Sequence, residues 1–169
     1  MDELETGDVI TDSGTLAEHF GEPLHVALAV EKNRLDDYHK RFIALSPFMC
    51  LASANGDGQP AVSPKGDAPG FVKVVDDVTL VLPDRPGNNK VESFHNLVEN
   101  PKVALIFFIP GRTESLRIHG EARLVLDGDL LAETKARDKL SRAATVITVT
   151  KAYFHCGKAL IRSKLWDAS

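Results

Sequence analysis

The amino-acid sequence predicts a mainly β domain, a small antiparallel barrel with a few helices, with a β-sandwich as the alternative. From residue 48 onward, short apolar runs rich in β-branched residues alternate with turn residues. Asn55-Gly56 and Asp57-Gly58 separate the first two of these runs. Because both dipeptides favour positive φ, they predict a hairpin. The sequence has no fixed-period repeat, which argues against a solenoid.

Composition narrows the class of protein. The chain has 169 residues, of which 43% are hydrophobic and 26% are charged, as in a soluble globular protein with one main domain. Its net charge of -4 argues against a general polyanion binder, so any anion site must be local. We find neither a secretory leader nor an apolar run of about 20 residues, and we therefore expect a cytoplasmic protein. Cys50 and Cys156 form no disulfide or metal pattern, and we expect two buried thiols.

Residues 1–45 are predicted to form a helical N-terminal extension. A short helix is expected at residues 13–20, ending before Gly21. A clearer helix is expected at residues 33–45, where apolar residues recur at helical spacing, and Pro47 ends it.

Residues 46–169 are predicted to form the barrel domain. The chain returns repeatedly to β-type runs, with one helix inserted among them at residues 89–99 and another at about 130–140. The strands are expected at residues 48–54, 59–64, 70–83 with a turn at Asp76-Asp77, 102–110, 114–126 and 144–156.

A basic corner joins a predicted strand to a predicted helix at residues 84–90, Asp-Arg-Pro-Gly-Asn-Asn-Lys. Asn89 is a suitable N-cap, and Glu92 three residues later completes a capping-box pattern. The first turn of a helix presents free N–H groups and the positive end of the dipole, which favour an anion. With Arg85 and Lys90 on either side, this corner predicts a phosphate site. The alternative is a solvated turn with two surface cations.

Two other polar groups could serve the same site. Ser63 and Lys65 lie at the end of a strand that could neighbour the corner. Residues 113–115, Thr-Glu-Ser, begin another strand and could hydrogen-bond the polar edge of a ring.

Three segments together resemble the pyridoxamine 5′-phosphate oxidase-like family of flavin-binding split barrels: residues 46–90, 96–125 and 153–166. The resemblance is closest to a bacterial branch of FMN-dependent proteins with Ser-Pro-Lys-Gly-Asp and Asp-Arg-Pro-Gly-Asn-Asn motifs, here residues 63–67 and 84–89. It implies a six-stranded antiparallel split barrel of the FMN-binding type. It also implies a homodimer that holds FMN in a groove between its subunits.

The resemblance implies three groups of cofactor-binding residues and no metal ligand. The first contacts the flavin or its phosphate, and comprises Ser63, Pro64, Lys65, Arg85, Asn88, Asn89 and Lys90. The second lies near the isoalloxazine, and comprises Glu114 and Ser115. The third closes the site from the C-terminal segment, and comprises Lys158, Arg162 and Trp166.

The resemblance thus implies an FMN-dependent oxidoreductase, which we expect to transfer two electrons between a reduced nicotinamide and a small organic acceptor. The flavin would supply the redox chemistry, so no catalytic side chain is assigned. The family's authentic oxidase has an Arg-x-His motif near its C-terminus for the substrate phosphate, whereas this chain has His-Cys-Gly-Lys at residues 155–158. We therefore expect no pyridoxamine phosphate oxidation. The alternatives are a deazaflavin-dependent reductase and a noncatalytic flavin- or haem-binding protein.

Overall fold

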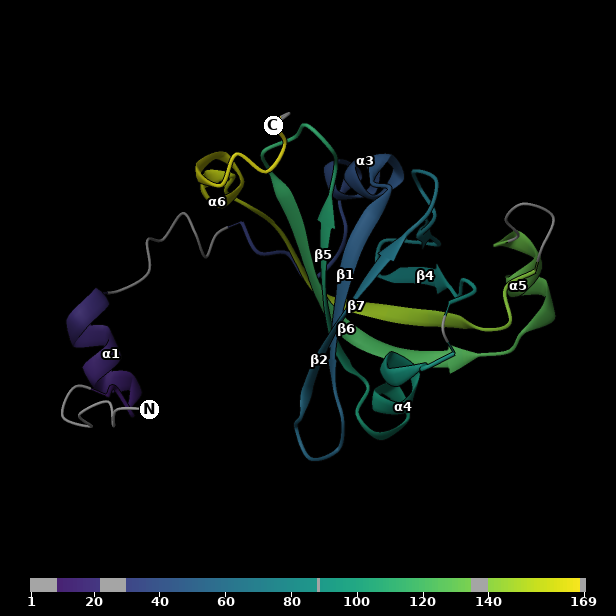
Figure 1. Ribbon diagram of the computed structural model, residues 1–169, viewed down its shortest axis with the longest axis horizontal. Coiled ribbons are helices and arrows are strands. Elements are labelled where there is room, and N and C mark those ends of the chain that lie inside the picture. The colour runs from purple at the N-terminus through teal and green to yellow at the C-terminus, as the bar shows by residue number, and fades with distance from the viewer. Residues whose placement is uncertain (1–8, 22–29, 88, 135–139, 168–169) are drawn as a thin grey trace. The chain divides into compact units, whose positions relative to one another are not determined.

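The computed structural model describes residues 9–21, 30–87, 89–134 and 140–167. The chain divides into two units, residues 1–30 and 31–169. In the first, helix α1 (Ser13–Phe20) begins after Asp12, whose carboxylate accepts a hydrogen bond from the Thr15 N–H at 2.9 Å (Figure 1). It ends at Gly21, whose φ of 74° is favourable only for glycine. The helix and its end confirm the prediction.

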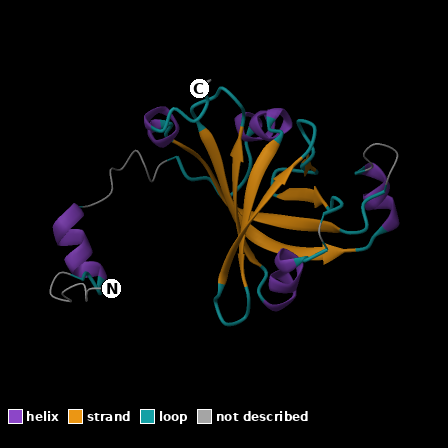
Figure 2. Cartoon of the chain, in the orientation of Figure 1, coloured by secondary structure: helices purple, strands orange, loops and turns teal. Residues whose placement is uncertain are grey.

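Seven strands form one antiparallel sheet in the described part of the second unit (Figure 2). The sheet has the order β2-β1-β5-β6-β7-β4-β3. The strands are β1 (Phe48–Ala54), β2 (Pro60–Gly66), β3 (Lys73–Val74), β4 (Thr79–Pro83), β5 (Lys102–Phe108), β6 (Ser115–Val125) and β7 (Ala144–His155).

The predicted mainly β split barrel is confirmed, with seven strands where the resemblance implies six. Strands β3 and β4 are the two arms of the run predicted at residues 70–83, on either side of Asp76-Asp77. The sheet does not close, because β2 and β3 are its edges and have no ladder between them in the described residues. The predicted hairpin joins β1 to β2, where the Asn55 N–H donates to the Gln59 carbonyl at 3.2 Å and Gly58 has a φ of 80°.

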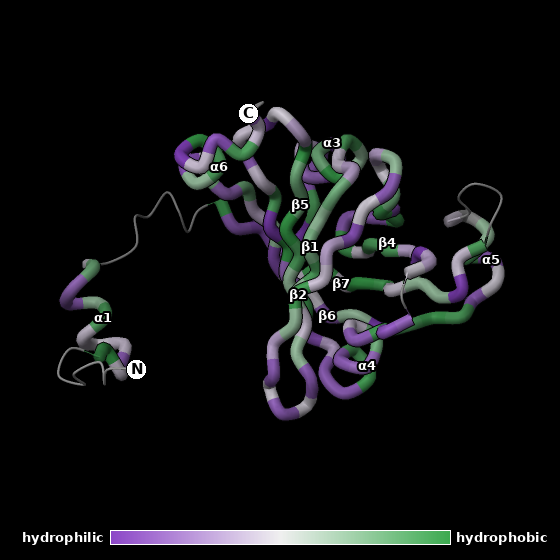
Figure 3. The backbone as a smooth tube through the Cα atoms, in the orientation of Figure 1, coloured by the Kyte–Doolittle hydropathy of each residue, from purple (hydrophilic) through white to green (hydrophobic). Residues whose placement is uncertain are grey.

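Alternation along the strands places the core on one face of the sheet. In β1, Met49, Leu51 and Ser53 are buried, whereas the residues between them are more accessible. Figure 3 shows apolar colour along β5 and β7 and hydrophilic colour at the tip of the β1–β2 hairpin. The core also includes Ile43 from one helix and Leu97 from another, so helices complete what the open sheet leaves uncovered.

Four helices accompany the sheet within the described residues of the second unit: α3 (Asp37–Leu45), α4 (Glu92–Glu99), α5 (Gly128–Glu133) and α6 (Lys158–Arg162). Helix α3 begins later than predicted, because Asp36 caps it in a reciprocal capping box with His39. It belongs to the unit that contains the sheet. Helix α5 begins at Gly128, and residues 135–139 of the predicted helix lie outside the described residues.

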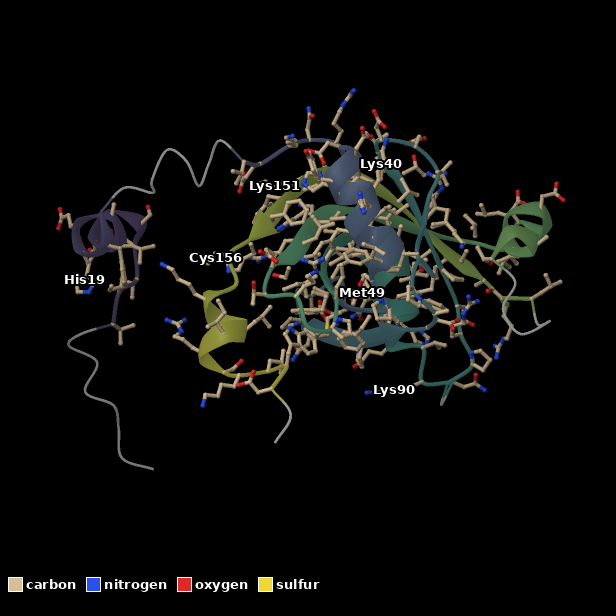
Figure 4. The ribbon with its side chains drawn as sticks, turned by 90° about the horizontal axis from the view of Figure 1, so that it is seen from above. His19, Lys40, Met49, Lys90, Lys151 and Cys156 are labelled. Atoms are coloured by element: carbon tan, nitrogen blue, oxygen red, sulfur yellow. The ribbon has the colours of Figure 1, made fainter. Side chains whose placement is uncertain are left out.

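The two cysteines differ from the expectation of buried thiols. Cys156 is exposed and lies next to α6 (Figure 4). Cys50 is partly buried on the side of β1 opposite Met49 and Leu51. Burial raises the pKa of the Cys50 thiol. No helix in the described ranges is long and apolar enough to cross a membrane.

Candidate binding site in the split of the barrel

A cleft lies in the split of the sheet, between β2 and the end of β4, which form no backbone hydrogen bonds with each other. It has two adjoining arms, an outer arm of about 510 Å³ and an inner arm of about 480 Å³. Both volumes are within the range of about 300–1,000 Å³ that is usual for small-molecule sites. The residues that line both arms come from β2, the basic corner and α4, and are Ser63, Pro64, Lys65, Asp84, Arg85, Pro86, Gly87 and Phe94.

The two arms differ in chemistry. The inner arm reaches core side chains such as Leu51, Phe71 and Leu82, which are at most 5% exposed. The outer arm is bordered by charged groups. Its lining includes four cations, Lys65, Arg85, Lys90 and Arg142, and two carboxylates, Asp84 and Glu92. Lys65, Asp84 and Arg85 line both arms. The outer arm adds Lys90 and Arg142, which favour an anionic group, and the inner arm adds the apolar side chains, against which a ring could pack.

Strand register directs Lys65 toward this cleft. Lys65 pairs with Met49 and Ser63 pairs with Leu51, so both β2 side chains lie on the core face of the sheet. Since β2 is an edge strand, this face opens to the cleft there instead of packing against further core.

The Lys65 ammonium is partly buried, and no described residue gives it a hydrogen bond or ion pair. Burial lowers the pKa of Lys65, and the Asp84 carboxylate partly opposes this effect. Burying a cation that has no hydrogen bond or ion pair costs free energy, and here the Asp84 carboxylate offsets the cost only in part. A bound anion would remove that cost.

Arg85, by contrast, is engaged within the protein. Its Nε donates to the Asp67 carboxylate at 2.5 Å, and its Nη1 donates to the Thr134 carbonyl at 3.1 Å and the Ser141 hydroxyl at 2.9 Å. The predicted role of Arg85 as a helper at the phosphate stays a prediction. What the structure adds is a second role for this side chain, as a connection between separate segments.

The start of α4 differs from the prediction. The N-cap is Val91 and not Asn89, and the predicted capping box is absent, because Val91 has no side-chain acceptor. Asn89 and Val91 have φ values of 57° and 44°, so the chain passes twice through the left-handed region before the helix begins. For a β-branched residue such as Val91 this conformation costs about 1–3 kcal/mol, and strain of this kind is common at binding sites. The predicted Asn88 lies outside the described residues.

Two cations flank this uncapped helix start. Lys90 forms an ion pair with Glu92 at 3.1 Å and lies at the rim of the unit (Figure 4). Arg142 donates from Nη1 to the Asn89 side-chain oxygen at 3.0 Å. Sequence reasoning missed Arg142, because no local pattern links it to a residue 53 positions away.

The remaining predicted residues do not line this cleft. Ser115 is buried at the start of β6, which is three strand spacings from β2, or about 14 Å. The Trp166 Nε1–H donates to the Arg112 carbonyl at 2.7 Å. Glu114, Lys158 and Arg162 are exposed. Helix α6 lies at the opposite end of the sheet from α5 (Figures 1 and 4).

The described residues contain no group of three or more His, Cys, Asp or Glu that could hold a metal ion. A phosphate ester joined to an apolar ring system matches the cleft better, because the outer arm has cations and an uncapped helix start and the inner arm has aliphatic and aromatic walls.

A family model described as pyridoxamine 5′-phosphate oxidase matches residues 35–156, well over half of the chain. The chain belongs to this family. Members of the pyridoxamine 5′-phosphate oxidase family generally bind flavin, in agreement with the chemistry of the cleft.

Solved structures with this fold include family members and other proteins. HupZ of Group A Streptococcus is 21% identical with a TM-score of 0.59, and the match covers 71% of this chain and 93% of HupZ. A proposed pyridoxamine 5′-phosphate oxidase from Lactobacillus delbrueckii is 23% identical with a TM-score of 0.57, covering 72% and 95% of the two chains. An F420 reductase is 18% identical with a TM-score of 0.50, covering 72% and 98%. At these identities the likeness establishes the fold alone. The chain has no match among curated proteins.

Proposed function

We propose that the protein binds FMN in the split cleft and is an FMN-dependent oxidoreductase acting on a small molecule. The observation that carries this proposal is the partly buried Lys65 ammonium, whose burial the Asp84 carboxylate offsets only in part and which lies where both arms of the cleft meet. Such a cation, between the arm that adds Lys90 and Arg142 and the arm that adds apolar core side chains, suits a flavin, which has a phosphate at one end and a ring system at the other.

Each part of the cleft then has a task. Lys65 and Lys90 hold the phosphate, and the first N–H groups of α4 assist them. The apolar walls of the inner arm exclude water from the ring. When bound, the flavin supplies the redox chemistry, and the protein supplies position and electrostatics.

The proposal includes a homodimer. One copy leaves the cleft open, whereas small-molecule sites usually bury about 70–90% of their ligand. Residues Glu114, Ser115, Lys158, Arg162 and Trp166 line no part of the cleft in their own chain. If they serve the flavin, a second copy supplies them.

The identity of the cofactor is tested by the mass and absorbance spectrum of the small molecule released when the purified protein is denatured. We expect FMN. Release of a deazaflavin would favour the reductase alternative. Release of haem would overturn the proposal.

Binding gives a second test. A charge-assisted hydrogen bond contributes about 1.5–3 kcal/mol, so titration calorimetry should show FMN binding at least about 10-fold more tightly than riboflavin, which lacks the phosphate. Lys90→Ala should reduce this preference, whereas Lys102→Ala, which alters an exposed lysine outside the cleft, should not. Equal affinities of the wild type for the two flavins would contradict the proposed site.

A further inference from the structure

The open sheet raises the question of what keeps the two walls of the cleft at a fixed separation. Strand β4 pairs with β3 only through Leu80 and Val81, so its last residues lack a neighbour on that side. Strand β2 pairs only with β1. No backbone ladder joins the walls in the described residues, so they are held by the packing of α4 against β1 and β2 and by side-chain contacts across the split.

Arg85 and Asp67 form such a connection. Asp67 directly follows β2, and Arg85 lies two residues beyond the end of β4. Their ion pair, at 2.5 Å, thus spans the split. The two side chains are 25% and 19% exposed, so solvent screens the pair less than it screens a pair on the surface.

Arg85 also reaches a third segment. Its Nη1 donates to Thr134 and Ser141, which are 2% and 7% exposed. The Thr134 hydroxyl lies 3.3 Å from the Ser141 hydroxyl, so the Arg85 contacts are part of a small buried network. Arg142, which follows Ser141 in the chain, donates a hydrogen bond to Asn89 of the corner. One guanidinium thereby fixes the end of β2, the corner and the segment before β7.

We propose that Arg85 and Asp67 are positioning residues that hold β2 against the basic corner and so set the spacing between Lys65 and Lys90. In this role Arg85 affects phosphate binding indirectly, because it holds together the two walls that carry Lys65 and Lys90. The inference rests on the proposed phosphate site and adds to it the element that keeps the site assembled.

Asp67 separates this role from a purely electrostatic one. A carboxylate near an anion site repels the anion, so simple electrostatics predicts that Asp67→Asn strengthens phosphate binding. The positioning role predicts the reverse, because the neutral amide loses the charge-assisted bond to Arg85 and the two walls separate.

Calorimetric titration with FMN and riboflavin tests the proposal on the wild type, Asp67→Asn, Arg85→Gln and the double variant. We expect each single substitution to raise the dissociation constant for FMN about 10-fold and that for riboflavin much less. The double variant should lose little beyond either single one, because the two residues act as one unit. Asp57→Asn, an exposed acid in the β1–β2 hairpin, is the matched control and should bind as the wild type does.

Arg85→Lys provides a check that keeps the charge. Lysine has no planar fork and cannot bridge Asp67, Thr134 and Ser141 together, so the positioning role predicts nearly the same loss as in Arg85→Gln. A direct phosphate ligand would be largely replaced by lysine. Hydrogen exchange without ligand is a second readout, and amides of residues 60–66 should exchange faster in both Arg85 variants while those of β5 do not change.

The outcomes are distinct. If the wild type shows no preference for FMN over riboflavin, both the proposed function and this inference fail. If the wild type prefers FMN and Asp67→Asn binds it equally well or more tightly, only the positioning role fails. Losses that add fully in the double variant would also refute that role.

Discussion

Replacing Lys65 with methionine should change stability and affinity in opposite directions. Methionine keeps the length and the apolar stem of lysine but removes an ammonium whose partial burial the Asp84 carboxylate offsets only in part. Because burial lowers the pKa of Lys65, the folded protein disfavours the charged form, and removing the charge should stabilise the fold. Substitutions that relieve such a cost at a functional site commonly stabilise by about 0.5–2 kcal/mol.

For Lys65→Met we expect a stabilisation at the low end of this range, about 0.5–1 kcal/mol, because Lys65 is only partly buried. For a domain of this size the melting temperature should then rise by about 1–4 °C. The same substitution removes a charge-assisted contact to the phosphate, worth about 1.5–3 kcal/mol, so the dissociation constant for FMN should increase about 10-fold to 100-fold.

Thermal melts without ligand and calorimetric titration with FMN measure the two effects. Lys102→Met, at an exposed position outside the cleft, should leave both nearly unchanged. A loss of stability in Lys65→Met with unchanged FMN affinity would show that the ammonium has an internal structural role, and the assignment of Lys65 to the phosphate would be wrong.

Further predictions concern the fold and the reaction. Burial lowers the pKa of His39 below its usual value near 6.5, and the Asp36 carboxylate opposes this shift in part. The His39 Nδ1 accepts a hydrogen bond from the Asp36 N–H at 3.2 Å. Folding therefore favours neutral His39. Its contribution to the free energy of unfolding should be complete above about pH 6.5 and should be lost as the pH falls through the pKa of the folded state. Urea denaturation at pH 7.5 and pH 5 should show that stability depends less on pH in His39→Gln than in the wild type. Gly120→Ala should destabilise by about 2–3 kcal/mol, because the added Cβ would clash with the Thr148 carbonyl oxygen, whereas Gly128→Ala meets no atom within 4 Å and should cost far less in the same melts. A hydrogen peroxide assay with pyridoxamine 5′-phosphate should detect no turnover, and rates of about 1–10 per second would overturn that expectation. Light scattering should give a dimer, and a monomer that binds FMN tightly would contradict the shared site.

Features that depend on neighbours in the chain could be predicted from the sequence. Alternating apolar residues define the strands, and turn dipeptides such as Asn55-Gly56 specify the hairpin, because both depend on neighbours in the chain. Helix α1 is likewise set locally, by Asp12 at its start and Gly21 at its end. The motif resemblance also predicts that Ser63 and Lys65 share a site with the basic corner, and these residues do line one cleft.

The tertiary structure alone decided which charges are paired and which remain available. Arg85 and Lys65 look alike in the sequence as cations near turns. Arg85, however, donates hydrogen bonds to Asp67 and Ser141, at separations of 18 and 56 residues, whereas the charge of Lys65 is only partly offset by Asp84. The start of α4 is a second example. Asn89 has a good capping pattern in the sequence, but its φ of 57° is left-handed and the helix begins after Val91 instead. The partner of a side chain depends on which distant segments lie beside it in the folded protein, and the local sequence does not specify those segments.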